Sequence, residues 1–323
     1  MNIAIIGAGK IAHKMADTIT RMPDAKCYAI ASRDLGKARL FANQYHMPKT
    51  YGSYEEMLLD PAVELVYIAT PHSHHAEHMK MCIEAGKPVL CEKAFTMNAA
   101  QAREITDLAR KKGIYVAEAI WTRYMPSRRM IDETLASGII GKVSAMTCNL
   151  FYPVQYVPRI MDPALAGGAL LDVGVYGLNF ADMHLGDEIE RIASSAALTD
   201  TGVDGNDSIT YYYKDGRMAQ ITAGIYARSD RKGIFYGDKG YMIVENINNP
   251  QSIDVFDLQD RPVKHLEVPR QISGYEYEVR EAMNLIRAGK TESASMPLAD
   301  SIRIMEKMDA LRAEWGVVYP QER

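Results

Sequence analysis

The side chains best suited to acid–base chemistry in this sequence are Lys93, Asp172 and Tyr176. Lys93 follows a short apolar run at the predicted end of a parallel strand, where doubly wound folds bind ligands. Asp172 and Tyr176 are four residues apart in a predicted helix, which puts both on one face. With a cation nearby to lower the phenol pKa from about 10, these groups could move a proton on and off a hydroxyl. A capped helix with a core tyrosine is the competing interpretation, and the spacing alone favours it.

A glycine-rich segment near the amino terminus predicts a dinucleotide site. The residues Gly7-Ala8-Gly9-Lys10-Ile11-Ala12 follow an apolar strand and open a helical pattern. Gly7 permits a tight turn, and Gly9 lets the backbone approach a pyrophosphate, which the N–H groups at a helix start attract. We therefore predict that the cofactor binds at Gly7, Gly9, Lys10 and Ile11.

The type of cofactor is indicated by the end of the second predicted strand, Ala31-Ser32-Arg33-Asp34. Many NAD sites have an acidic residue there, which binds the ribose hydroxyls. Ser32 and Arg33 instead offer a hydroxyl and a guanidinium to a 2′-phosphate, whereas Asp34 is typical of a helix N-cap. We predict NADP rather than NAD; the alternative is that Arg33 is a surface residue without a ligand.

The elements that position these residues form two predicted domains. Up to about Trp121, apolar runs at residues 3–6, 28–31, 65–69, 89–91 and 114–117 alternate with helical patterns. This alternation predicts an α/β fold with a doubly wound parallel sheet. Beyond it, strands from residue 142 onward, including 208–213, dominate and predict a largely antiparallel sheet. We predict a cofactor domain at 1–121 and an α+β substrate domain at 122–323, with the helix at 298–314 packing back on the first.

Composition excludes several classes of partner. The 323 residues carry a net charge of -4, which gives no basic field for nucleic acid. No run approaches the roughly 20 apolar residues of a membrane span, and the first apolar run starts at Ile3, leaving no room for a signal sequence. The four cysteines have no metal-binding spacing and are expected to be buried free thiols. We expect a cytoplasmic protein without nucleic-acid or membrane partners.

Together these motifs resemble the Gfo/Idh/MocA oxidoreductase family over essentially the whole chain. The resemblance is carried by GAGKIA, Thr70-Pro71-His72-Ser73-His74-His75, Glu92-Lys93, and Asp172 with Tyr176. Four further segments are similar to the dimeric dihydrodiol dehydrogenase and D-xylose dehydrogenase branch. They are Ala31-Ser32-Arg33-Asp34, Tyr51-Gly52-Ser53-Tyr54-Glu55-Glu56, Glu118-Ala119-Ile120-Trp121-Thr122-Arg123 and Leu171-Asp172-Val173-Gly174-Val175-Tyr176.

The resemblance implies a Rossmann domain, an open-faced sheet often used for dimerisation, and hydride transfer between NAD(P) and an alcohol or sugar carbon. It makes Lys93 the lysine beside the nicotinamide, Tyr176 the general acid/base and Asp172 its companion. It also implies cofactor contacts from Thr70, Pro71, His75 and Glu92. The sequence departs from the family at Tyr176, where many relatives have histidine, and at Ala94, where most have proline.

Residues at the predicted domain junction are expected to line the substrate pocket: Trp121, Arg123, Phe151 and Tyr152. The aromatic faces of Trp121, Phe151 and Tyr152 suit a sugar, another polyol or a dihydrodiol equally well, and packing is the alternative role for all four residues. His72, His74, His75 and His78 lack an acidic or thiol partner, so we expect no metal site. The resemblance implies a homodimer or homotetramer. A catalytically silent NADP(H)-binding sensor on the same fold remains the alternative function.

Overall fold

The computed structural model describes residues 1–323 and divides into two compact units. The first unit contains residues 1–124 and 271–306, and the second contains residues 125–270 and 307–323. Residues 271–306, which we assigned to the second domain from the sequence, therefore belong to the first unit. The chain passes between the units a last time inside helix α10 (Leu298–Trp315).

The first unit is built on a six-stranded sheet in which every strand pair is parallel, in the order β3-β2-β1-β4-β5-β6. The strands are β1 (Asn2–Ile6), β2 (Lys26–Ala31), β3 (Lys49–Tyr51), β4 (Leu65–Ile68), β5 (Val89–Glu92) and β6 (Val116–Ala119). The helices between them are α1 (Lys10–Thr20), α2 (Leu35–Gln44), α3 (Tyr54–Leu58), α4 (His75–Glu84) and α5 (Ala99–Lys112). The predicted doubly wound sheet is thus confirmed, and it is a Rossmann fold.

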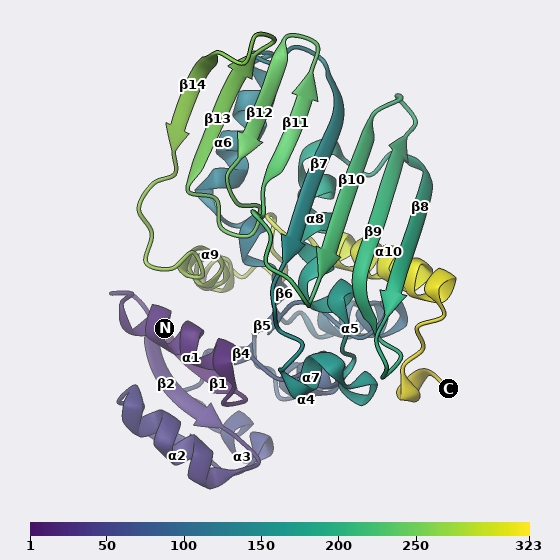
Figure 1. Ribbon diagram of the computed structural model, residues 1–323. Coiled ribbons are helices and arrows are strands. Elements are labelled where there is room, and N and C mark those ends of the chain that lie inside the picture. The colour runs from purple at the N-terminus through teal and green to yellow at the C-terminus, as the bar shows by residue number, and fades with distance from the viewer. The chain divides into compact units, whose positions relative to one another are not determined.

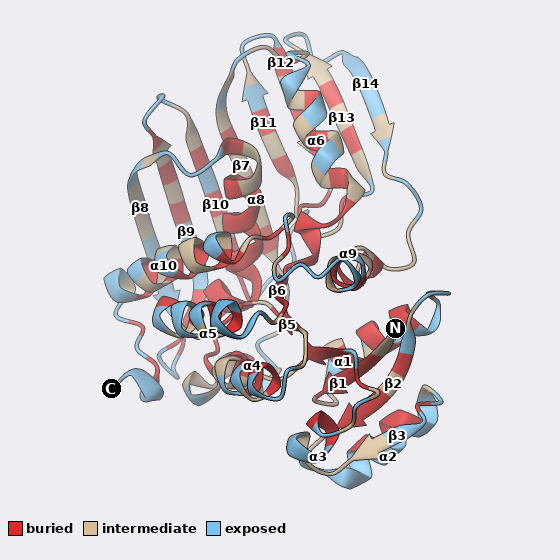
Figure 2. Cartoon of the chain, turned by 180° about the vertical axis from the view of Figure 1, so that it is seen from behind, coloured by how far each residue is buried: buried red, intermediate tan, exposed pale blue.

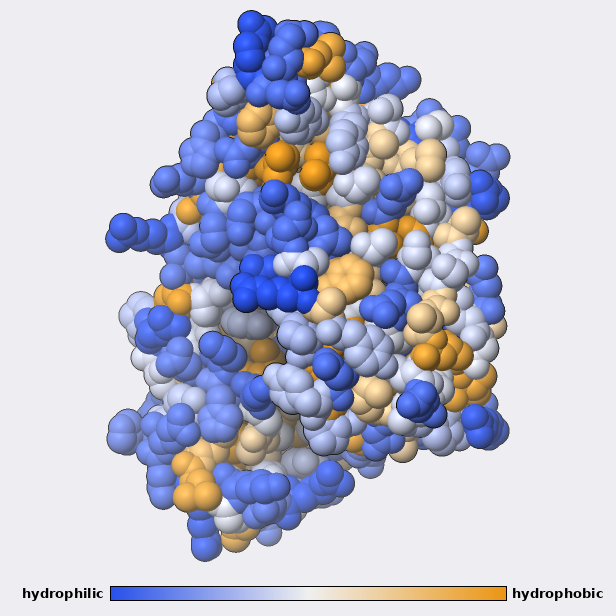
Figure 3. All heavy atoms as spheres, in the orientation of Figure 1, coloured by the Kyte–Doolittle hydropathy of each residue, from blue (hydrophilic) through white to orange (hydrophobic).

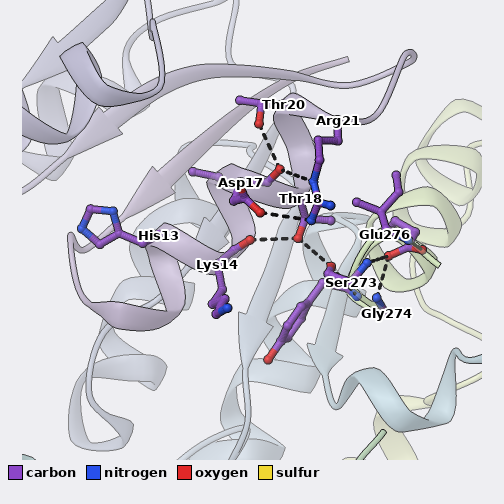
Figure 4. A network of polar contacts seen from close by, with 12 residues as sticks. His13, Lys14, Asp17, Thr18, Thr20, Arg21, Ser273, Gly274 and Glu276 are labelled. Atoms are coloured by element: carbon purple, nitrogen blue, oxygen red, sulfur yellow. Dashed lines mark hydrogen bonds and ion pairs between the residues drawn. The ribbon is translucent and has the colours of Figure 1, made fainter. Parts of the chain in front are cut away.

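Helix α9 (Glu276–Arg287) completes this unit although it follows β6 by more than 150 residues of sequence. Its buried residues Val279 and Met283 pack into the same core as Ile3 and Ile5 of β1. Figure 4 shows the polar contact that joins the loop before α9 to α1: the hydroxyls of Thr18 and Ser273 are 2.7 Å apart. In the same view the Glu276 carboxylate accepts backbone N–H groups from this loop, which fixes the start of the helix.

Two strands of the first unit differ from the sequence prediction. Strand β3 is short, three residues long, and was not predicted. Strand β6 begins two residues later than expected because Ile114 still belongs to the end of α5: its N–H donates to Ala109. Gly113 allows the helix to end in this way, because it has a left-handed φ of 66°, a conformation that glycine adopts without a steric cost.

The second unit holds an eight-stranded sheet in the order β14-β13-β12-β11-β7-β10-β9-β8, in which only β7 and β10 pair in parallel. Its strands are β7 (Val143–Phe151), β8 (Ile189–Leu198), β9 (Asp204–Tyr213), β10 (Met218–Gly224), β11 (Gly233–Gly237), β12 (Gly240–Val244), β13 (Ser252–Asp257) and β14 (Pro262–Glu267). The largely antiparallel sheet is therefore confirmed. Its helices are α6 (Pro126–Ala136), the short α7 (Pro158–Met161) and α8 (Val175–Leu185).

One face of this sheet carries helices of its own unit, and the other does not. Figures 1 and 2, seen from opposite sides, show α6 and α8 lying on the same face. Figure 3, in the orientation of Figure 1, shows polar and apolar side chains interspersed on the face without helices. The sheet is open-faced, as the family resemblance implied.

The segment before α8 corrects one reading of the sequence. The helical run Pro163–Leu185 is long and apolar enough to cross a membrane, whereas we expected no such segment. However, 89% of its most apolar 18-residue stretch is buried inside the protein, as expected for a helix in a protein core. Within this run, Leu170–Gly174 forms a π-helical turn that leads directly into α8.

Candidate functional site

Four of the predicted site positions lie in loops that follow strands of the parallel sheet, three of them directly after the strand. Gly7 follows β1, Ser32 follows β2, and Lys93 follows β5. Thr70 comes two residues after β4. Because the carboxyl ends of parallel strands share one edge of the sheet, these loops gather there, where ligands bind in open α/β folds.

Gly7 and Gly9 have the geometry that a dinucleotide requires. Gly7 has a φ of 95°, and a Cβ there would lie 2.9 Å from the carbonyl oxygen of Ala69, so only glycine fits between the loops after β1 and β4. A Cβ at Gly9 would meet nothing of the protein within 4 Å, and no side chain caps the start of α1. Lys10 and Ile11 are the first residues of that helix. These observations fit a pyrophosphate at the helix N-terminus.

The Arg33 side chain is exposed and has an aromatic neighbour that sequence reasoning missed. Burial raises the pKa of the Tyr54 phenol, and the charge of Arg33 opposes that shift, which puts the two groups next to each other. The Tyr54 ring meets His78 edge-on with ring centroids 4.8 Å apart. Asp34 is the N-cap of α2, as predicted, because its side chain accepts the Lys37 N–H at 3.0 Å. Arg33 is therefore available to an anion, whereas Asp34 is occupied.

His75 joins the loop after β4 to the loop after β5. Its Nδ1 is 2.8 Å from the Ala94 carbonyl oxygen, and its Nε2 is 2.8 Å from the Thr70 carbonyl oxygen. Burial lowers the pKa of this imidazole to about 4, so the ring is neutral at neutral pH and donates through one nitrogen. Pro71 precedes the short helical turn His72–His74 that leads into α4. No group of three or more metal-ligating side chains is present in residues 1–323.

Two buried glutamates hold the backbone around Lys93. Glu92 accepts a hydrogen bond from the Tyr67 hydroxyl, and its carboxylate also accepts the Lys93 N–H at 3.2 Å. Glu118 accepts the N–H of Phe95 at 3.1 Å, two residues beyond Lys93. The Lys93–Ala94 peptide bond is cis. The sequence offered Glu118 only as part of a family-like segment, and gave no sign that its side chain contacts this loop.

Burial also decides the charge of Glu118. It raises the pKa of this carboxyl to about 7, and the nearby Arg123 guanidinium offsets only part of the shift. At neutral pH the group is therefore divided between its two protonation states, close to the predicted catalytic lysine.

Asp172 and Tyr176, the other two predicted catalytic residues, lie in the second unit. Asp172 is on the π-helical turn and Tyr176 on the first turn of α8, and each is 8% exposed. The spacing argument assumed a regular α-helix, but the four-residue interval crosses the junction from π to α geometry. Arg159 on α7 binds Asp172 with 2.9 Å between Nη2 and Oδ1. Sequence reasoning missed Arg159 because its irregular, proline-rich surroundings carry no periodic signal.

The four predicted pocket residues are divided between the two units. In the first unit, the Trp121 ring stacks on Tyr275 at 4.2 Å between ring centroids, and Arg123 pairs with Asp300 at 2.8 Å. Both side chains are buried, so packing accounts for the contacts we describe. In the second unit, Phe151 ends β7 and the Tyr152 hydroxyl accepts a hydrogen bond from Asn248 at 3.1 Å. Phe151 and Tyr152 are only half-buried.

A Rossmann sheet with a glycine loop at the end of its first strand fits a dinucleotide-binding protein, and the open-faced sheet forms a separate second domain. Residues 1–119 match the family described as "Oxidoreductase family, NAD-binding Rossmann fold", and residues 129–243 match the "GFO/IDH/MocA C-terminal domain". The chain therefore belongs to the Gfo/Idh/MocA oxidoreductase family, as the resemblance of its motifs indicated.

Several curated relatives share one name. The chain is 33% identical over 332 residues to trans-1,2-dihydrobenzene-1,2-diol dehydrogenase from Mus musculus, covering 99% of this chain and 98% of the relative. It is 35% identical over 324 residues to the protein of the same name from Xenopus tropicalis, with 98% of each chain covered.

Solved structures share the fold at lower identity. KijD10, a 3-ketoreductase from Actinomadura kijaniata solved with NADP and TDP-benzene, matches with a TM-score of 0.87 at 24% identity over 97% of both chains. An aldose-aldose oxidoreductase from Caulobacter crescentus, solved with glycerol, also has a TM-score of 0.87, at 19% identity over 97% of this chain and 96% of that one.

Proposed function

We propose that this protein is an NADP-dependent oxidoreductase that transfers a hydride between the nicotinamide and a carbinol or carbonyl carbon. The substrate would be a trans-dihydrodiol, a sugar or a sugar derivative. The observation that carries this proposal is the 33% identity to a dihydrodiol dehydrogenase over 99% of the chain. The exposed Arg33 beyond β2, where NAD sites place an acid, supports the choice of NADP.

In the proposed reaction Tyr176 is the general acid/base and Lys93 assists it. Oxidation of a carbinol breaks its C–H and O–H bonds and forms a carbonyl, and the Tyr176 phenolate oxygen takes the O–H proton to become the phenol. The bound cofactor supplies the hydride acceptor. The Lys93 ammonium stabilises the phenolate form that makes Tyr176 a base, and in the reverse direction the same phenol returns the proton. Asp172, which forms an ion pair with Arg159, would orient the Tyr176 hydroxyl.

The test is turnover followed at the reduced-nicotinamide absorbance band. Wild-type protein would be assayed with NADP and NAD against trans-diols and aldoses, with Tyr176→Phe as the key variant and Tyr212→Phe, on β9, as a matched control. We expect turnover with NADP that falls at least about 100-fold in Tyr176→Phe and is unchanged in Tyr212→Phe. Equal turnover by wild type and Tyr176→Phe would exclude the proposed mechanism.

The same experiment separates the enzyme from a silent sensor. A sensor would bind NADPH tightly and turn over nothing in the panel, and Tyr176→Phe would change neither property. Calorimetric titration of NADPH into both proteins supplies the binding half of this comparison.

We also propose that the protein self-associates as a homodimer or homotetramer through the open face of its second sheet. Ile234 and Ile243 are cross-strand partners on β11 and β12 and are only half-buried in the single chain. Tyr241 and Phe256 stack beside them with ring centroids 5.0 Å apart. Sedimentation of Ile243→Lys against wild type tests this: a monomeric variant supports the proposal, and an unchanged assembly contradicts it.

A further inference from the structure

Strand β9 begins with two buried aspartates that the proposed chemistry does not use. Asp204 is 0% exposed and Asp207 is 3% exposed. In a regular strand, residues three apart point to opposite faces of the sheet. Here Ala197 pairs with Asn206 while Leu198 pairs with Asp204, so Gly205 is an extra residue that forms a β-bulge. The bulge turns both aspartates toward the interior.

The two carboxyl groups lie at the two ends of the π-helical turn Leu170–Gly174. Asp204 accepts the backbone N–H of Leu170, at the first residue of the turn. At the other end, the Asp207 Oδ2 is 3.6 Å from where a Cβ on Gly174 would be. Asp172 lies on this turn and Tyr176 lies two residues after it. Asp204 therefore binds the start of the segment that carries both groups, and Asp207 lies beside its end.

A glycine makes this close approach possible. Gly168 has a φ of 110°, and a Cβ on it would lie 2.2 Å from the Asp204 Oδ1. Tyr319 holds the same loop from another side, because its hydroxyl donates to the Gly167 carbonyl oxygen at 2.7 Å.

Two charged carboxylates would leave this arrangement with unpaired oxygens. Both oxygens of Asp207 and the Oδ1 of Asp204 are buried without a hydrogen-bond partner when neither group carries a proton. Burial and the charge of Asp204 hold the pKa of Asp207 far above its ordinary value, and burial raises the pKa of Asp204 as well. Neighbouring buried carboxyl groups cannot both ionise readily, so such a pair keeps one proton.

The other titratable groups facing the two aspartates do not supply a cation that is free to balance a second negative charge. Arg312 is the cation whose field reaches Asp204. That guanidinium already binds Asp309 at 2.9 Å and Glu322 at 2.8 Å. The remaining group is the Tyr319 phenol, whose pKa is raised well above its ordinary value by burial and then by the charge of Asp204.

We propose that Asp204 and Asp207 share one proton, with the protonated Asp207 donating to Asp204, and that this pair positions the helical segment bearing Asp172 and Tyr176. The remaining oxygen of Asp204 then accepts the Leu170 N–H. Both aspartates are positioning residues, since they act on the reaction through the helix. Only the positioning role rests on the proposed function, because the shared proton can be measured without turnover.

The first measurement is infrared spectroscopy of the carboxyl C=O stretch at pH 7. Asp207→Asn keeps the size of the side chain and an N–H donor toward Asp204 but cannot ionise. We expect it to lose one protonated-carboxyl band relative to wild type, whereas Asp200→Asn, at an exposed position, keeps every such band. Identical spectra for wild type and Asp207→Asn would overturn the shared proton, whatever the enzyme's activity.

The second measurement tests positioning. Asp207→Asn should retain kcat within about twofold, because its amide replaces the shared proton's hydrogen bond. Asp207→Val, which has no donor, should lower kcat at least about tenfold and leave the KM for NADP unchanged. Equal kcat in wild type and both variants would overturn the positioning role. If wild type turns over no substrate, the proposed function fails, but the infrared result still decides whether the two aspartates share a proton. If Asp207→Val does not fold, the pH profile of kcat in Asp207→Asn replaces it as the test. Retained kcat with an altered pH profile supports the positioning role, and an unaltered profile contradicts it.

Discussion

The two units of this protein position their candidate chemical groups by different means. In the first unit, Gly7, Thr70 and Lys93 are placed by the backbone, since each lies in a loop that follows a parallel strand. In the second unit, Asp172 and Tyr176 lie on a helical segment fixed by side chains distant in sequence, such as Asp204, 34 residues from the Leu170 that it binds. We expect groups placed by strand ends to tolerate changes in their surroundings better than groups that are held by buried side-chain contacts.

The largest expected effect tests whether the backbone-placed site carries the chemistry. Lys93→Met keeps much of the side-chain length and removes the charge, so we expect turnover to fall by about 10²- to 10⁴-fold. The fold should persist, because the strand end is set by the sheet. Lys80→Met is the matched control: this lysine is exposed and pairs with Glu104 at 3.2 Å. Steady-state kinetics with NADP measures both, and equal rates would show that the strand-end site is not where the chemistry occurs.

A stability measurement tests how strongly the second unit depends on a single buried side-chain contact. Gly168→Ala would place a Cβ 2.2 Å from the Asp204 carboxylate and force a φ of 110° on alanine, so we expect a loss of about 2 to 5 kcal/mol. Gly186→Ala, in the same unit, has a φ of 82° but meets nothing within 4 Å, so it should lose about 1 kcal/mol or slightly more. Urea unfolding at pH 7 compares the two. Equal losses would mean that backbone strain, and not the contact with Asp204, sets the cost.

The same contrast explains what the sequence could predict. The Rossmann sheet, the glycine loop and the position of Lys93 follow from local order, because alternating strands and helices leave few topologies. The start of β9 was predicted at residue 208 instead of Asp204, since Asp204-Gly205-Asn206-Asp207 has the composition of a turn. Burial of Asp204 depends on tertiary contacts such as that with the Leu170 N–H, and no local pattern encodes them.

Glu118 tests the difference between the two units, because it is a buried side chain that supports the strand-end site of the first unit. Its pKa is raised from about 4.5 to about 7 by burial, so the folded protein keeps a proton that the unfolded chain releases. The contribution of Glu118 to the free energy of unfolding is therefore greatest below pH 4.5. It falls as the pH rises to about 7 and stays low at higher pH.

Glu118→Gln cannot ionise and still offers an oxygen to the Phe95 N–H, so it should lack this loss of about 3 kcal/mol. Thermal unfolding from pH 4 to 9 measures the difference between variant and wild type. Glu55→Gln, at an exposed position, should follow the wild-type curve. If Glu118→Gln also follows it, burial of this carboxyl does not control its proton.

The smallest expected effect concerns the cofactor. Arg33→Ala should weaken NADP binding by about 10- to 150-fold, because a charge-assisted pair with phosphate contributes roughly 1.5 to 3 kcal/mol, and it should leave NAD binding nearly unchanged. Arg39→Ala, at an exposed position on the neighbouring helix α2, should change neither affinity. Calorimetric titration at two salt concentrations adds a second criterion, since an exposed ion pair weakens with salt. Parallel losses of NADP and NAD would mean that Arg33 supports the loop itself, and the first unit would then also depend on a side chain that the strand ends do not place.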